Sequence, residues 1–288
     1  MSVDSADDML DDPVFNIYLH ALENESLVPD PLESYADGIT SRAFNTSKEL
    51  GIESAIVLNL WMYIVHLLQN VFKSCEMNNS ADIDLLDQAL YMWIGEDQRE
   101  GSRSGYLMYS IAEYAESELL GDVIDPTQAE VYTNSMLIDL FNDARSLIST
   151  DNYCSNDDQS RLHQILSSIQ SKMTIPLIQK LIYHMHNDNK SYIKLYAYSI
   201  VPLIESCNPG SFSDLKKILL DKDFDLVDLE LSLIILESAF NCLGITCDEV
   251  GVFHGIENKE STCNDRNIMM VGFSPSTDSR EVSKILVV

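Results

Sequence analysis

The sequence has few basic residues for its length. Its 288 residues include 18 Lys and Arg against 46 Asp and Glu, which gives a formal net charge of −28 and a pI near 4.3. A surface with this charge repels nucleic-acid phosphates and anionic lipid headgroups, so we expect no nucleic-acid partner. The charge suits either solubility in a salty medium or an acidic surface for basic partners and cations, and both interpretations stay open.

The sequence also lacks the local motifs of the common enzyme classes. It contains no GxSxG, HExxH, dinucleotide-binding or phosphate-loop pattern. The acidic stretch at residues 221–232 has Leu226 where a calcium loop requires Gly and Ser232 where it requires a bidentate Glu. We therefore expect a protein that is not an enzyme and has no cofactor, although a catalytic site built from residues distant in sequence stays open.

No two cysteines form a CxxC motif, which argues against structural zinc. The chain instead has six cysteines spread over its last three quarters: Cys75, Cys154, Cys207, Cys242, Cys247 and Cys263. An even number of separate cysteines near loops and helix ends favours disulfides over buried thiols. We predict at least two disulfides and leave their pairing open.

Disulfides imply an oxidising compartment, and N-x-S/T sequons agree with it. They occur at Asn24, Asn45, Asn78 and Asn189 and make these residues candidates for glycosylation. Residues 1–10 have neither the basic nor the apolar region of a secretion signal. We therefore expect an extracellular or cell-surface protein whose numbering begins inside a longer precursor.

Residues 54–72 carry no charged side chain over a length close to that of a membrane span. However, Asn59, His66 and Asn70 fall on one helical stripe with Tyr63 beside them. This pattern predicts a core helix with a hydrogen-bonded polar seam and no membrane span.

Strand-type alternation is almost absent, whereas apolar residues recur with helical spacing from residue 49 onward. We predict an all-α fold, an antiparallel array of about nine helices with an irregular, disulfide-fastened C-terminal tail. Ser80, Thr174 and Ser211 are candidate helix caps. The predicted helices cover residues 50–75, 81–94, 103–120, 128–149, 158–172, 175–187, 190–206, 212–220 and 226–243.

The pattern divides the chain into three parts. Residues 1–48 are a loosely helical lead-in, residues 49–247 form one helical domain, and residues 248–288 are an irregular tail rich in turn-forming residues. We expect Cys263 to anchor this tail.

Two stretches resemble a known kind of repeat. Residues 86–116 (LDQALYMWIGEDQREGSRSGYLMYSIAEYAE) and residues 173–219 are similar to a repeat unit of secreted or surface-exposed helical proteins of algae and diatoms. Some of these are low-iron-inducible, iron-assimilating surface proteins. The sequence GFSPSTDSREVS at residues 272–283 resembles the opening of a further copy. The resemblance implies an extracellular helical module whose partners are other protein chains or repeat copies, and it implies iron binding where ligands exist.

Carboxylates and histidines are the candidate ligands of iron or a divalent cation. Glu113 and Glu116 have the i, i+3 spacing that places both carboxylates over one helical turn, and they are the candidate metal pair. His184 and His186 point to different sides of a helix, so they cannot chelate together there. We therefore expect a non-catalytic extracellular module, with cation binding in metal assimilation as the alternative and an enzyme of unrecognised type as the third interpretation.

Overall fold

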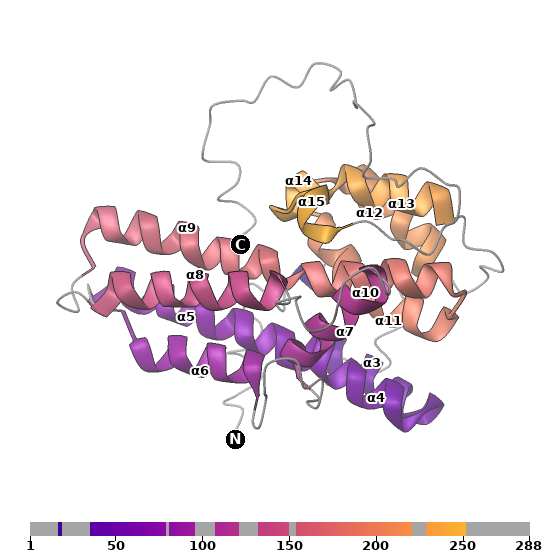
Figure 1. Ribbon diagram of the computed structural model, residues 1–288, viewed down its shortest axis with the longest axis horizontal. Helices are drawn as coiled ribbons and strands as arrows, with labels where there is room; N and C mark the ends of the chain where they lie inside the picture. The colour runs from indigo at the N-terminus through magenta and orange to yellow at the C-terminus, as the bar shows by residue number, and fades with distance from the viewer. Residues whose placement is uncertain are drawn as a thin grey trace, which may run out of the picture.

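The computed structural model describes residues 17–18, 35–78, 81–95, 107–120, 132–149, 154–220 and 229–251. Every regular element in these ranges is a helix, and the same ranges contain no strand. Each range predicted to be helical contains an observed helix, so the predicted all-α helical array is confirmed (Figure 1). The predicted irregular tail beyond residue 251 lies outside the described residues.

The helices, in chain order, are α3 (Tyr35–Thr46), α4 (Lys48–Ser54), the π-helical segment η1 (Ala55–Leu60), α5 (Trp61–Asn78), α6 (Ile83–Ile94), α7 (Met108–Leu120), α8 (Tyr132–Ser149), α9 (Asn156–Met173), α10 (Ile175–His186), α11 (Lys190–Ile204), α12 (Pro209–Leu215), the π-helical segment η3 (Lys216–Leu220), α13 (Leu229–Ser238), α14 (Phe240–Leu243) and α15 (Cys247–Val250).

Helices α5, α6, α8 and α9 form an up-and-down four-helix bundle, at the left of Figure 1. The amide of Asp82, just before α6, donates to Ser74 Oγ near the end of α5 at 2.9 Å. At the opposite end of the bundle, Trp93 Nε1 near the end of α6 donates to Asn134 Oδ1 at the start of α8 at 3.0 Å. Helices α5 and α6, and likewise α6 and α8, therefore run antiparallel.

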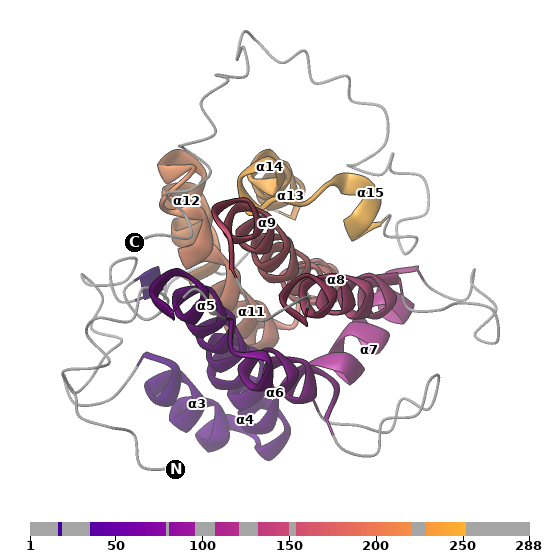
Figure 2. The same cartoon turned by 90° about the vertical axis from the view of Figure 1, so that its left-hand side faces the viewer.

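Helices α7, α10 and α11 form the second half of the molecule, in which α10 packs against both α7 and α11. The short helices α12 to α15 lie on one side of this half, and α3 with α4 lies on the opposite side (Figure 2). Buried apolar side chains from both halves join in one hydrophobic core.

The longest continuous helix runs through α4, η1 and α5. Among the described residues, Lys48–Met77 is the one helix long and apolar enough to cross a membrane, and 50% of its most apolar window is buried inside the fold. Trp61, Ile64 and Val71 are completely buried. The segment thus packs within the helical core.

The predicted polar seam of this helix is hydrogen-bonded. Asn59 Nδ2 donates to Thr40 Oγ1 of α3 at 3.2 Å, and Gln88 of α6 donates to the hydroxyl of Tyr63 at 3.1 Å. His66 and Asn70 share a hydrogen bond of 2.8 Å. The seam faces α3 and α6, which confirms the prediction.

Part of the lead-in segment contributes to the core. Tyr18 is 1% exposed, and its hydroxyl donates to the carbonyl oxygen of Ser199 in α11 at 2.7 Å. Tyr35 makes the equivalent bond to the carbonyl oxygen of Tyr198 at 3.0 Å. Two tyrosines before residue 48 therefore attach to a helix that follows much later in the chain, at sequence separations of 181 and 163.

The helix caps differ from those predicted. Asp82 caps α6, and the predicted cap Ser80 lies outside the described residues. Asn208 caps α12 by accepting from the amide of Ser211 at 3.1 Å, so Ser211 lies inside the first turn and its prediction as a cap was wrong. Thr174 precedes α10, but its hydroxyl donates to a carbonyl of α9 and does not cap α10.

Candidate functional site

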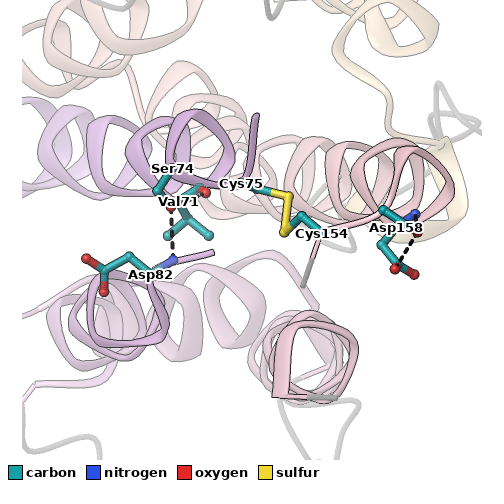
Figure 3. Close-up of a disulfide and its surroundings, with 7 residues drawn as sticks. Val71, Ser74, Cys75, Asp82, Cys154 and Asp158 are labelled. Carbon is teal, nitrogen blue, oxygen red and sulfur yellow. Dashed lines mark hydrogen bonds between the residues drawn. A yellow bond between two sulfur atoms is a disulfide. The ribbon is translucent and has the colours of Figure 1, made fainter. Parts of the chain in front are cut away.

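The disulfide between Cys75 and Cys154 links two helices of the four-helix bundle (Figure 3). The Cα atoms lie 5.6 Å apart, and both side chains are buried. Next to Cys154, Ser155 Oγ caps α9 by accepting from the amide of Asp158 at 3.2 Å. The disulfide therefore fixes the beginning of α9 against the last turns of α5.

A second disulfide joins Cys207, after α11, to Cys242 in α14, with the Cα atoms 5.7 Å apart. Cys247 is also disulfide-bonded, and Cys263 lies outside the described residues. The prediction of at least two disulfides is confirmed. The paired cysteines are separated by 79 positions in one disulfide and by 35 in the other. The sequence left the pairing open because it does not show which distant cysteines come together.

A cluster of buried and half-buried polar side chains lies between α4, α7, α10 and α11. We call it the α10–α11 polar cluster. It consists of Glu53 of α4, Glu118 of α7, Lys180 and His184 of α10, and Tyr192 and Tyr196 of α11.

The charged and hydroxyl groups of this cluster bind one another across helices. The hydroxyl of Tyr196 donates to Glu53 Oε1, and Lys180 Nζ donates to Glu118 Oε2 at 2.8 Å. Burial raises the pKa of Glu53, although Lys180 and the Tyr196 hydroxyl oppose the shift. Burial and the nearby Glu53 also hold the pKa of Tyr196 well above its ordinary value, so its hydroxyl remains a proton donor.

The imidazole of His184 is the exception, because it has no hydrogen-bond partner on either nitrogen among the described residues. The residue is 6% exposed, and its ring stacks on Tyr192 and Tyr196 with centroid distances of 4.6 and 5.7 Å. Burial lowers the pKa of His184 to about 3, and the positive charge of Lys180 adds to the shift. The ring is therefore neutral at physiological pH.

Shifted pKa values gather at functional sites and also in structural ion-pair networks. In this cluster Tyr196 donates to Glu53 and Lys180 to Glu118, which ties α11 to α4 and α10 to α7. Such buried polar contacts specify how helices pack. The arrangement therefore holds the four helices together. It also contains one buried imidazole, His184, which becomes protonated in acid.

The predicted metal pair, Glu113 and Glu116, lies on the inward side of α7. Glu113 is 4% exposed, and Glu116 Oε1 accepts from the amide of Tyr132 at 3.3 Å. Burial raises the pKa of Glu116, while the backbone amides of Tyr132 and Thr133 oppose the shift. Glu116 thus caps the N-terminus of α8 from a neighbouring helix. No group of three or more His, Cys, Asp or Glu within the described ranges is arranged to hold a metal ion.

The predicted histidines and glycosylation candidates lie in different surroundings. His184 and His186 diverge as expected, since His184 is buried and His186 is exposed. Of the sequon residues, Asn45 and Asn189 are exposed. Asn24, the side chain of Asn78, and the acidic stretch at residues 221–228 lie outside the described part of the chain.

Sequence reasoning did not single out Glu53, Lys180 or Tyr196. One signal could have done so, because Lys180 interrupts the apolar face of an otherwise hydrophobic helix (IPLIQKLIYHMH). A lone lysine on such a face needs a buried carboxylate partner. The partner could not be identified from the sequence, since Glu118 lies 62 residues away and carboxylates are abundant in this chain.

We also compared the chain with known proteins. No protein-family model, curated protein or solved structure matches it.

Proposed function

We propose that the chain is a non-catalytic helical module of the cell surface or extracellular space, which acts in surface structure or in association with other protein chains or further copies of itself. The observation that carries this proposal is the pair of disulfides, Cys75–Cys154 and Cys207–Cys242, because disulfides form and persist in oxidising compartments.

The use of the buried polar groups supports a non-catalytic role. The hydroxyl of Tyr196 and the ammonium of Lys180 are both engaged by carboxylates of other helices. Gln179 Nε2 likewise donates to the carbonyl oxygen of Val250 at 2.9 Å, which attaches α15 to α10. These groups serve packing, and the net charge of −28 favours basic or cationic partners at the surface.

Glycosylation belongs to the same proposal. Asn189 is exposed at the turn between α10 and α11, and Ser191 of the same sequon is also exposed. Asn45 is exposed near the end of α3. Both asparagines are accessible acceptors if the chain passes through a secretory pathway.

The proposal is tested on the full chain produced through a secretory pathway. We expect intact-mass measurement after alkylation under denaturing conditions to show at least two disulfides, and reduction to release all six thiols. Six alkylated thiols without reductant would remove the basis for the extracellular role. Sedimentation velocity of the oxidised chain over a concentration series then tests association, and a strict monomer counts against association between copies.

The second candidate function is cation binding in metal assimilation, which the inward-facing pair Glu113 and Glu116 favours. Calorimetric titration with iron and with calcium at low and high salt distinguishes a built site from attraction by the overall charge. A built site binds with fixed stoichiometry and resists salt, whereas a diffuse field is screened within about 10 Å at 0.1 M ionic strength.

A further inference from the structure

The contact between α10 and α11 contains a buried histidine whose ring nitrogens are not used by neighbouring residues. The ring of His184 stacks on the rings of Tyr192 and Tyr196, and Tyr183 meets it edge-on at a centroid distance of 5.2 Å. Neither Nδ1 nor Nε2 of His184 has a hydrogen-bond partner among the described residues. A neutral ring fits this aromatic setting, but a protonated ring would carry two N–H donors into it with no acceptor among the described residues.

Two carboxylates near this ring are already engaged by other residues, and Lys180 opposes its protonation. Lys180 lies one turn earlier on the same helix and repels a second positive charge. On the side of α7, Glu118 is already bound to Lys180 at 2.8 Å. On the side of α4, Glu53 already accepts from Tyr196.

Two carboxylates on other helices that contact α10 are also engaged elsewhere. Glu249 of α15 is held by Lys172 of α9 at 2.6 Å. The described side chains of α13 include one carboxylate, Glu237, which is itself engaged.

We propose that His184 makes the contact between α10 and α11 acid-sensitive, because protonation of its ring places an imidazolium, which has no acceptor among the described residues, against two tyrosine rings and beside the Lys180 ammonium, and this opens the contact. The protein then responds to acidification through a defined pair of helices.

One effect works in the opposite direction. An imidazolium stacked on tyrosine faces gains a cation–π attraction. However, this gain is smaller than the loss of hydration of a buried charged group without hydrogen-bond partners. The lowered pKa of His184, which burial causes first and Lys180 second, agrees that desolvation dominates.

The sign of the pH dependence follows from proton linkage. The pKa of His184 is about 3 in the folded chain, against an ordinary value of 6.5. The unfolded chain therefore binds more protons between these values, so stability falls as the pH falls through this window. Between pH 7 and pH 5 this residue alone should raise the unfolding equilibrium constant about 25-fold.

The test compares urea unfolding of the full, oxidised chain at pH 7 and pH 5 for the wild type, His184→Phe and His186→Phe. Phenylalanine keeps an aromatic ring that does not titrate, and His186 is an exposed histidine two residues later on the same helix. We expect His184→Phe to lose the 25-fold effect and His186→Phe to retain it. Equal pH dependence in the wild type and in His184→Phe overturns the proposal.

Two further measurements locate the effect and guard against a variant that does not fold. After correction for the slower intrinsic exchange at pH 5, hydrogen exchange in the wild type should show a larger rise in opening for peptides from α10 and α11 than for peptides from α5 and α6. Nuclear magnetic resonance titration of labelled histidine in the wild type should show His184 still neutral at pH 5 in the folded state. A His184 ring that titrates near pH 6.5 in the folded protein refutes the proposal even if His184→Phe cannot be made.

Discussion

At the scale of single residues, the fold depends on polar side chains that bond across helices inside an apolar core. Tyr196 is completely buried, and its hydroxyl binds Glu53, whose carboxylate is largely shielded from water. A buried donor or acceptor that loses its partner costs more than the bond itself contributed. These pairs therefore determine which helices pack together.

Replacing Tyr196 with phenylalanine should show this dependence. The substitution keeps the ring but leaves Glu53 without its hydroxyl donor, so we expect a loss of about 1–3 kcal/mol in the free energy of unfolding at pH 7. The loss in the free energy of unfolding should be smaller near pH 5. The pKa of Glu53 is raised, so its carboxyl group is protonated more readily at this pH, and a neutral carboxyl group depends less on the hydroxyl donor.

Tyr91→Phe is the matched control, since Tyr91 is 73% exposed. Chemical denaturation of both variants measures the difference. Equal stabilities would show that the Tyr196 hydroxyl contributes nothing to packing.

The residue scale is where sequence-based prediction was least complete. The i, i+2 spacing of His184 and His186 predicted that they diverge, and they do. The same spacing could not show which of them is buried against the tyrosines of α11. That contact depends on how α10 and α11 pack, and side-chain periodicity within one helix carries no information on its neighbours.

At the scale of elements, helical periodicity predicted positions better than ends. The predicted segment at residues 158–172 corresponds to α9 at Asn156–Met173, and the segment at residues 175–187 corresponds to α10. Ends are set by single hydrogen bonds, and several polar residues compete for each cap. At α12, Asn208 is followed by Pro209, which fits the first turn because its missing N–H is not needed there.

Helix α8 gives an element-scale prediction, because its first amides are satisfied by Glu116 of α7. Glu116→Ala removes the acceptor and should lower the free energy of unfolding by about 1 kcal/mol, in the range of lost helix caps. Glu116→Gln keeps an acceptor oxygen and should restore most of this loss.

The same two variants separate a cap from a metal ligand. If Glu116 serves as a cap, calcium and iron should not change the stability order of wild type, Gln and Ala variants in thermal unfolding. If the pair Glu113 and Glu116 holds a cation, both substitutions should abolish a metal-dependent rise in melting temperature that the wild type shows. That second pattern would favour metal assimilation over the structural role of Glu116.

At the scale of the whole molecule, the disulfides Cys75–Cys154 and Cys207–Cys242 stabilise different halves of the array. Cys75–Cys154 ties α5 to α9 across a sequence separation of 79, and Cys207–Cys242 ties the end of α11 to α14 across a separation of 35. The even number of cysteines predicted such links, whereas their partners follow from helix packing. One hydrophobic core runs through both halves.

Removal of each disulfide should measure how much it stabilises its half. The chain-entropy model gives a stabilisation of about 4 kcal/mol for loops of these lengths, with the longer loop ahead by less than about 1 kcal/mol. We therefore expect Cys75→Ala/Cys154→Ala to lose slightly more stability in urea unfolding than Cys207→Ala/Cys242→Ala.

Because a domain has only about 5–15 kcal/mol of stability in total, the loss of both disulfides should bring the chain close to unfolding at 37 °C. Reductant also breaks the disulfide of Cys247, so it should lower the stability of the wild type by at least the combined loss and have a smaller effect on each double variant. A wild-type chain whose unfolding midpoint is unchanged by reduction would contradict this expectation and would also remove the reason to place the protein in an oxidising compartment.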